Sequence, residues 1–268
     1  MNIISSKDNE VIKNIRKLKE KKYRDLQNEY IVEGIKLIKE AIEENAKIKL
    51  IVICEECLKE KIIDKNLLYE IAKYECVYVT EKVFNLISDV KAPQGILSVI
   101  EKNNKEEQIN YNEDIIIVLD GIQDPGNLGT ILRTVDSANL KQIIVSSNTA
   151  DCYNPKVVRS TMGAIFRVNV IETEDLIQTL KNIKKHKYDI VVTSLETENS
   201  IYDIKYNKKV IVIGNESKGV SKEIQELADQ KVKIPMLGKT ESLNASVATA
   251  IIAVSYTHLR AHETKANL

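Results

Sequence analysis

Glycine is scarce in this chain and is concentrated in three loops. Of the nine glycines, six lie in G-I-Q-D-P-G-N-L-G-T (121–130), G-N-E-S-K-G-V-S (214–221) and M-L-G-K-T-E-S-L-N-A-S (236–246). Glycine allows a backbone to turn sharply or to approach a ligand closely. One such loop is weak evidence, because glycine turns between a strand and a helix are often purely structural. Three of them predict a ligand pocket built largely from main chain.

The common nucleotide and metal motifs do not occur in the sequence. The glycines of 121–130 do not follow G-x-G-x-x-G, and no G-x-x-x-x-G-K-[ST] is present, which disfavours a dinucleotide-binding dehydrogenase and a P-loop NTPase. Cys54 and Cys57 form a C-x-x-C, but Cys76 and Cys152 do not complete it with zinc-like spacing. We interpret the four cysteines as reduced structural thiols and expect no metal site.

Apolar runs next to the glycine loops predict the sheet that positions them. The runs are continuous rather than alternating, as in parallel strands covered by helices on both faces. They span 115–120, 142–147, 189–195, 209–214 and 232–235. The helices expected between them span 128–138, 174–186 and 220–228. In an open parallel sheet, ligands bind beyond the carboxyl ends of the strands, where the three loops lie.

The first hundred residues also alternate strands with helices, which predicts a smaller α/β domain. Apolar residues at helical spacing predict one helix over 8–22. Residues 101–114 are charged and turn-forming and lack apolar periodicity, as in a linker. We therefore expect an N-terminal domain over 1–104, a linker over 105–113 and an α/β domain over 114–256.

The charges balance over the whole chain but not locally. Lys+Arg and Asp+Glu both number 39, which argues against coating of nucleic acid by bulk charge. The stretch K-N-I-R-K-L-K-E-K-K-Y-R (13–24) contains seven basic residues and one acidic residue. Such a stretch is typical of phosphate contacts and also of a solvated helix face. No apolar run approaches the roughly 18 residues of a membrane helix and no secretory signal is present, so we expect a cytoplasmic protein without a membrane partner.

The segments N-L-G-T-I-L-R (127–133), G-N-E-S-K-G (214–219) and S-L-N-A-S (242–246) follow one another in this order. Together they resemble the three signature motifs of the SpoU/TrmH family of RNA 2'-O-ribose methyltransferases. N-P-K-V-V-R-S-T-M-G-A (154–164) resembles a fourth family segment, and Y-I-V-E-G-I-K-L-I-K-E-A (30–41) resembles the family's L30e-like substrate-binding domain. The resemblance covers nearly the whole chain, to about Tyr256.

The resemblance implies the fold and the cofactor. It predicts an N-terminal L30e-like α/β domain for RNA and a C-terminal parallel-sheet, trefoil-knotted (SPOUT) methyltransferase domain that acts as a homodimer. The cofactor is S-adenosyl-L-methionine, placed in the knot. The cofactor-binding residues implied are Gly214, Gly219, Ile234, Pro235, Met236, Gly238 and Leu243.

The resemblance also assigns catalytic and RNA-binding residues. Arg133 is the catalytic residue, as the base or, because arginine is always protonated, as a phosphate or alkoxide clamp. Asn127, Glu216, Asn244 and Ser246 complete the centre, although Asn127, Asn244 and Ser246 are also candidates for helix capping. The residues expected to contact RNA are Arg159, Ser160, Lys13, Arg16, Lys17, Lys21 and Lys22.

Two features depart from the family pattern. Asn139 stands where the family commonly has glycine, and asparagine tolerates the left-handed turn required there. Residues 257–268, T-H-L-R-A-H-E-T-K-A-N-L, do not resemble the usual continuation of the last helix. We interpret them as an atypical, foreign tail, and we assign no catalytic role to His258 or His262.

The function predicted is S-adenosylmethionine-dependent 2'-O-ribose methylation of RNA. Ribosomal RNA of the 23S type is favoured over transfer RNA, because a separate L30e-like domain resembles the ribosomal members. Two alternatives stay open: a transfer RNA 2'-O-methyltransferase, and a non-catalytic RNA-binding protein of ribosome assembly. The sequence does not identify the methylated nucleotide, because loop shape and single-stranded contacts select it.

Overall fold

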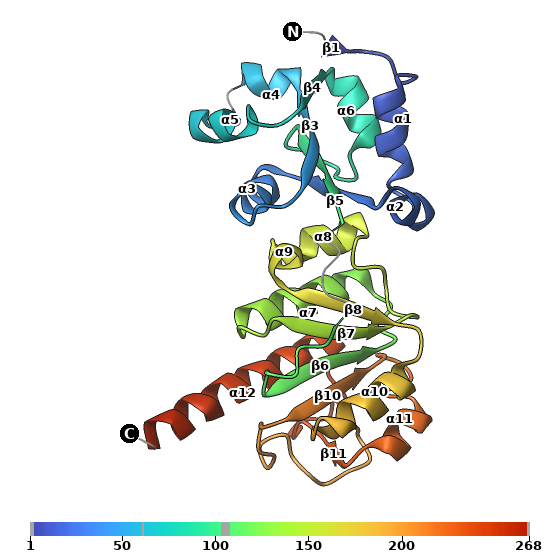
Figure 1. The fold of residues 1–268 in the computed structure, drawn as a ribbon, viewed down its shortest axis with the longest axis vertical. Helices are drawn as coiled ribbons and strands as arrows, with labels where there is room; N and C mark the ends of the chain where they lie inside the picture. Colours follow the sequence, from blue (N-terminus) through green and yellow to red (C-terminus); the bar gives the residue numbers. More distant parts are fainter. Residues whose placement is uncertain (1–2, 61, 103–107, 267–268) are drawn as a thin grey trace. The chain divides into compact units, whose positions relative to one another are not determined.

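The computed structural model describes residues 3–60, 62–102 and 108–266, and the chain forms two compact units. The first unit contains residues 1–104 together with 151–166, and the second contains 105–150 and 167–268 (Figure 1). Residues 151–166, which we expected in the second domain, thus pack with the first unit. The first part of the predicted linker, 105–107, lies outside the described residues.

The first unit is built on a five-stranded mixed sheet in the order β1-β4-β3-β5-β2. Its strands are β1 (Ile3–Ile4), β2 (Glu29–Glu33), β3 (Ile48–Cys54), β4 (Cys76–Val79) and β5 (Ile96–Glu101). Its helices are α1 (Glu10–Lys17), α2 (Lys21–Gln27), α3 (Ile35–Glu43), α4 (Glu55–Lys59), α5 (Lys65–Ile71), α6 (Glu81–Ile87), α8 (Pro155–Thr161) and α9 (Ala164–Arg167).

The single helix predicted over 8–22 is wrong, because α1 ends at Lys17 and α2 begins at Lys21. Buried Arg24 explains the break. Its Nη1 donates hydrogen bonds to the carbonyl oxygens of Leu18 and Lys19, both at 2.8 Å. Helix ends leave carbonyl groups without an intrahelical partner, and here a side chain from the next helix satisfies two of them. The sequence pattern does not reveal that Arg24 turns inward.

The second unit is built on a six-stranded sheet in the order β11-β9-β10-β6-β7-β8, and every neighbouring pair is parallel. Its strands are β6 (Ile115–Asp120), β7 (Gln142–Ser146), β8 (Asn169–Thr173), β9 (Asp189–Thr193), β10 (Lys209–Gly214) and β11 (Gln230–Val232). Its helices are α7 (Pro125–Ser137), α10 (Leu176–Lys185), α11 (Lys222–Leu227) and α12 (Ala245–Ala266). The predicted parallel α/β class is confirmed.

The core of the second unit explains why these runs form parallel strands. Ile115 to Leu119 of β6 are completely buried, and Val210, Ile211 and Val212 of β10 are too. Such strands bury both faces and need helices on each side. Strands β6 and β10 pair in register from Lys209↔Ile115 to Gly214↔Asp120. Because the strand order reverses here, the loops after β6 and β10 begin side by side, as at the ligand sites of open α/β sheets.

The two departures from the family pattern, Asn139 and the tail, lie in a turn and in the last helix. Asn139 has φ 58°, so the left-handed turn expected there is confirmed. Residues 257–266 of the atypical tail are helical, because α12 runs to Ala266. Residues 257–266 contain no glycine or proline and include good helix formers such as leucine, arginine, alanine and glutamate. No helix in the described part of the chain combines the length and apolarity needed to cross a membrane.

Candidate active site

The loops after β9, β10 and β11 line a cavity of about 400 Å³ at the carboxyl edge of the second sheet. Its wall contains residues 213–220 of the second glycine loop and residues 232–234 at the end of β11. Five of the seven cofactor-binding residues implied by the resemblance line this cavity: Gly214, Gly219, Ile234, Met236 and Leu243. Pro235 and Gly238 are exposed and are not among its lining residues.

Gly214 is required by backbone packing within the cavity wall. A Cβ atom at this position would lie 2.2 Å from the carbonyl carbon of Gly219 and 2.2 Å from the nitrogen of Val220. The backbones of residues 215 and 219 also exchange two hydrogen bonds, of 3.1 and 2.8 Å. The loop therefore folds back on Gly214 in a turn that only glycine fits. At Gly219, by contrast, an added Cβ would meet nothing within 4 Å.

Four of the predicted catalytic side chains form one hydrogen-bonded chain. Ser246 Oγ donates to Asn244 Oδ1 at 2.6 Å, and Asn244 Nδ2 donates to Asn127 Oδ1 at 2.9 Å. Asn127 Nδ2 in turn donates to Glu216 Oε1 at 2.5 Å. The chain starts at a buried serine and ends at an exposed carboxylate on the cavity wall. We call these four residues the polar relay.

Fixed backbone donors set the direction of the polar relay. The backbone N–H of Ser246 donates to Asn244 Oδ1 at 2.9 Å, so the amide nitrogen of Asn244 must face the other way, toward Asn127. Asn127 then presents its oxygen to Asn244 and its nitrogen to Glu216. Glu216 therefore accepts the hydrogen bond at the end of the polar relay through its Oε1.

The capping alternatives are resolved differently for the two asparagines. Helix α7 begins at Pro125 and its N-cap is Asp124, whose Oδ1 accepts from the backbone N–H of Asn127 at 2.8 Å. The prediction that Asn127 caps α7 is therefore wrong. The sequence signal for the true N-cap is Asp124 followed by Pro125, since proline is favoured at the first helical position. Asn244 precedes α12 and accepts from the backbone of Ser246, so it caps that helix while it also belongs to the polar relay.

Arg133 lies outside the polar relay. It is exposed on α7, two turns after Asn127, and its guanidinium has no hydrogen-bond or ion-pair partner among the described residues. Thr130 lies between Asn127 and Arg133 on the same exposed face of α7. All five N–H donors of the Arg133 guanidinium group are thus available to a ligand.

Asn215 is a site residue that the sequence analysis missed. Its Oδ1 accepts from the backbone N–H groups of Ser217 and Lys218, at 2.9 and 3.2 Å. Its Nδ2 donates to the carbonyl oxygen of Gly121 at 2.8 Å. One side chain therefore shapes the loop that contains Glu216 and joins it to the loop after β6. It lies inside the G-N-E-S-K-G motif, but its neighbours there gave no sign of this role.

Replacing Asn215 with aspartate should lower the free energy of unfolding by about 1–3 kcal/mol, because an oxygen would then face the Gly121 carbonyl in place of a donor. The loss is measured by chemical denaturation. Asn199→Asp is the matched control, since its Nδ2 makes only an exposed 3.4 Å contact with the Lys231 carbonyl. Equal losses for the two variants would contradict the role assigned to Asn215.

The basic stretch predicted to bind RNA lies on α1 and α2 of the first unit. Arg16, Lys17, Lys21 and Lys22 are exposed, whereas Lys13 is paired with Glu10 at 2.9 Å. The ammonium groups of Lys17 and Lys22 each lie 5.9 Å from the ring centroid of Tyr23. Arg24, the last basic residue of the stretch, is buried against Asp151 and is not available to RNA.

Arg159 and Ser160 lie on α8 and are half-buried. Ser160 Oγ donates to the carbonyl oxygen of Lys156 at 2.9 Å within the helix. Arg159 Nη1 is buried without a hydrogen-bond partner in the described structure. A buried donor without an acceptor is costly, and this Nη1 is not accessible to a ligand in the structure as described.

The C-x-x-C pair lies in the core of the first unit, where its thiols pack as structural side chains. Cys54 and Cys57 are buried, and all four cysteines are free thiols. Burial raises the pKa of Cys54 to about 12 and also raises the pKa of Cys57, which keeps both thiols protonated and unreactive. A Cβ on Gly95 would lie 1.8 Å from Cys57 Sγ, so this glycine makes room for the thiol. No cluster of metal-binding side chains occurs within the described ranges.

A parallel sheet with a main-chain-lined cavity and a polar relay at its carboxyl edge defines an α/β enzyme that uses a small-molecule cofactor. Its sequence relationships identify the family. The chain belongs to the SpoU rRNA Methylase family, whose model matches residues 114–254, and an MRM3-like substrate binding domain matches residues 9–98. The resemblance seen in the motifs is thereby confirmed.

Known relatives extend over most of the chain. It is 30% identical over 261 residues to the 23S rRNA (guanosine(2553)-2'-O)-methyltransferase RlmP of Bacillus subtilis, covering 97% of this chain and 100% of the relative. It is 33% identical over 202 residues to the 23S rRNA (guanosine-2'-O-)-methyltransferase RlmB of Blochmanniella floridana, covering 70% and 78%. The crystal structure of an AdoMet-bound rRNA methyltransferase from Sinorhizobium meliloti has a TM-score of 0.81 at 28% identity, covering 96% of this chain and 98% of that one.

Proposed function

We propose that this protein transfers the methyl group of S-adenosyl-L-methionine to the ribose 2'-hydroxyl of a guanosine in 23S ribosomal RNA. The observation that carries the proposal is the polar relay, which ends at Glu216 on the wall of the glycine-rich cavity. The two relatives named above both act on guanosine in 23S rRNA, and the one from Bacillus subtilis aligns with 97% of this chain.

The residues of the cavity fit S-adenosylmethionine. Leu195, Ile213 and Leu243 offer apolar surface for the faces of the adenine ring. The main chain around Gly214 and the carboxylate of Glu241 offer partners for its polar edges, hydroxyls and positive charge. When bound, the cofactor supplies a methyl group that its sulfonium already activates.

The protein's own contribution is positioning and electrostatics. Orientation of a hydroxyl for in-line attack can supply roughly 7–11 kcal/mol of barrier reduction. The polar relay fixes Asn127 and Glu216 so that they can orient the ribose without rearrangement. Arg133 remains charged, so it stabilises the developing alkoxide or binds the adjacent phosphate, and the proton of the 2'-hydroxyl is released to solvent water.

The active form is a knotted homodimer in this proposal. Support comes from family membership and from α12, which packs against α7 and leaves Val247 and Val254 exposed. Apolar side chains in this position suit an interface between two copies of the chain. Light scattering tests the point, because a dimer has twice the 30.4 kDa of one chain.

The reaction is tested with labelled S-adenosylmethionine and two RNA pools, an unmodified 23S rRNA transcript and unmodified transfer RNA. We expect label in the 23S transcript at one guanosine, located by the resistance of its 3' linkage to alkaline cleavage. Label in transfer RNA alone would favour the transfer RNA alternative. Cofactor binding without methyl transfer to either RNA would contradict the assignment of 23S rRNA as the substrate. Failure to bind the cofactor would favour the non-catalytic RNA-binding alternative.

A further inference from the structure

A second basic surface lies on the second unit and plays no part in the site described above. It consists of residues 181–189, at the end of α10 and the start of β9, and residues 205–209, which lead into β10. We call it the amino-edge surface. In a chain with no net charge, these 14 residues contain one acidic residue, Asp189, one histidine and seven lysines: Lys181, Lys184, Lys185, Lys187, Lys205, Lys208 and Lys209.

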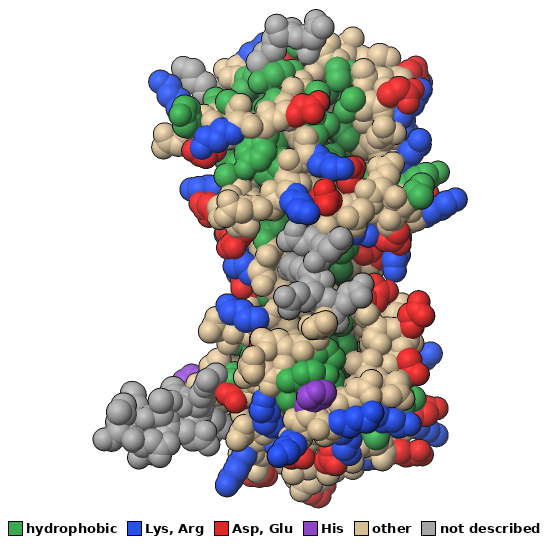
Figure 2. Space-filling model, in the orientation of Figure 1, with side chains coloured by type: hydrophobic (Ala, Val, Ile, Leu, Met, Phe, Trp, Pro, Cys, Tyr) green, Lys and Arg blue, Asp and Glu red, His purple; other side chains and the backbone are tan. Residues whose placement is uncertain are grey.

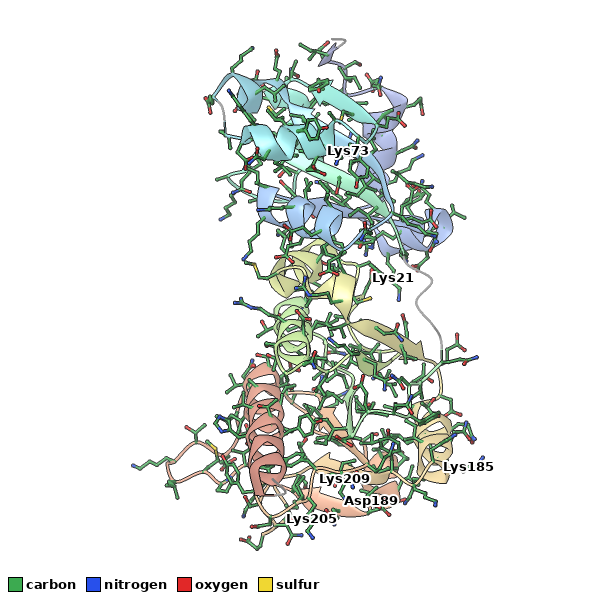
Figure 3. The ribbon with its side chains drawn as sticks, turned by 60° about the vertical axis from the view of Figure 1, so that its left-hand side comes forward. Lys21, Lys73, Lys185, Asp189, Lys205 and Lys209 are labelled. Carbon is green, nitrogen blue, oxygen red and sulfur yellow. The ribbon has the colours of Figure 1, made fainter. Side chains whose placement is uncertain are left out.

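The two segments are neighbours in space. The backbone N–H of Asp189 donates to the carbonyl oxygen of Lys208 at 2.9 Å, and Lys209 is paired with Asp189 both in strand register and as an ion pair. Figure 3 labels four of these residues, Lys185, Asp189, Lys205 and Lys209, on the second unit. In the space-filling view, lysine and arginine side chains gather around a histidine on this unit (Figure 2).

Two of the seven lysines are ion-paired, Lys209 is also buried, and the acidic residues Glu113 and Asp114 lie beside this surface. Lys184 pairs with Asp229 at 2.8 Å, and Lys209 pairs with Asp189. The remaining five lysines have no ion pair with a carboxylate among the described residues. Lys208 is held by neutral groups: its Nζ donates to the Tyr111 carbonyl and to the Tyr188 hydroxyl, and it lies 4.8 Å from the centroid of the Tyr188 ring.

Aromatic rings lie among these lysines. The rings of Tyr111 and His186 are stacked, with centroids 3.6 Å apart and an interplanar angle of 9°. His186 is exposed, and Tyr188 packs at 6.1 Å from Tyr111. Lysines around one exposed aromatic ring, that of His186, suit a nucleic acid, because phosphates need cations and an unpaired base can stack on a flat ring; Tyr111 is half-buried and Tyr188 is buried behind it. A purely acidic protein partner would use only the cations.

We propose that the amino-edge surface binds the phosphate backbone of the substrate RNA at a distance from the methylated nucleotide. The inference rests on the proposed function for the identity of the RNA. The surface lies at the amino ends of β9 and β10, whereas the cavity lies beyond their carboxyl ends. Strands of five or six residues separate the two by about 17–20 Å. An RNA of several nucleotides is therefore needed to reach both.

The test replaces three unpaired lysines in the full-length protein, Lys181→Gln, Lys185→Gln and Lys187→Gln together. The control, Lys39→Gln, Lys59→Gln and Lys73→Gln, removes the same charge from lysines of the first unit that each pair with a glutamate three or four residues away in the chain. A third variant with arginine at 181, 185 and 187 keeps the charge. Binding to the 23S rRNA transcript is measured by fluorescence anisotropy over a series of salt concentrations, and cofactor binding by calorimetry.

We expect the first variant to raise the Kd for RNA on the order of 10-fold and to reduce the slope of log Kd against log salt by about 2–3, as for the loss of three phosphate contacts. The control and the arginine variant should keep the wild-type slope, and all three should bind the cofactor normally. An unchanged slope in the first variant, or an equal loss in the control, would overturn the proposal. Because the readout is RNA binding, a failure of methyl transfer in the wild-type protein would count against the proposed function alone.

Discussion

Replacement of Arg133 with alanine is expected to reduce kcat for methyl transfer on the order of 10²–10³-fold, the usual loss when one preorganised donor to a developing negative charge is removed. The guanidinium is exposed and has no partner within the described structure, so its removal leaves no buried charge uncompensated. The melting temperature and the Kd for S-adenosylmethionine should therefore stay near their wild-type values.

The kinetic pattern separates the two roles of Arg133. Loss in kcat indicates stabilisation of the alkoxide, whereas a rise in KM for RNA indicates a grip on the phosphate in the ground state. Arg133→Lys keeps the charge but not the planar fork, so it should recover only part of the rate. Lys73→Ala removes an exposed cation elsewhere and serves as the control. Near-wild-type turnover of Arg133→Ala would remove this residue from the mechanism.

Replacement of Gly214 with alanine should abolish cofactor binding, with a rise in Kd of at least about 100-fold, or about 2.7 kcal/mol. The added Cβ would lie 2.2 Å from backbone atoms of Gly219 and Val220, which cannot move aside as a flexible side chain can. The loop has to open, and the cavity wall and the position of Glu216 change with it. Calorimetric titration with S-adenosylmethionine measures the effect.

Gly238→Ala is the matched control for the fold. A Cβ at Gly238 would meet nothing within 4 Å, so its melting temperature should equal that of the wild-type protein. Gly214→Ala should melt several degrees lower because its loop is strained. If Gly214→Ala bound the cofactor with wild-type affinity, the loop conformation described here would not be the one that forms the cavity wall.

Hydrophobic pattern was sufficient to predict most of the second sheet. Its central strands, such as β6 and β10, are buried on both faces and therefore read as continuous apolar runs. Strand β8 was missed because it lies at the edge of the sheet and only Ile171 of its five residues is buried. The linker was placed by its polar composition, yet Ile109 and Tyr111 within it pack against the core of the second unit. Two isolated apolar residues give no periodic signal.

The hydrogen bonds that join the residues of the polar relay could not be predicted from the sequence. Motif resemblance identified Asn127, Glu216, Asn244 and Ser246, although it did not reveal that they share one directed chain of hydrogen bonds. That direction follows from a backbone N–H at the start of α12, which no residue type encodes. Tertiary contacts also determine the role of Arg24. Its positive charge is typical of an RNA-binding residue, but its partners are two backbone carbonyl groups and Asp151.

The polar relay also has a consequence for the order in which this protein folds. Asn127 and Glu216 are 89 residues apart in the chain, and Asn127 and Asn244 are 117 residues apart. Contacts of such long sequence separation form late, because the entropy of closing the intervening loop opposes them until the rest of the sheet has assembled. A ribosome that synthesises this chain must reach Asn244 before Asn127 can meet this partner. The polar relay is therefore incomplete until the segment that begins α12 has docked.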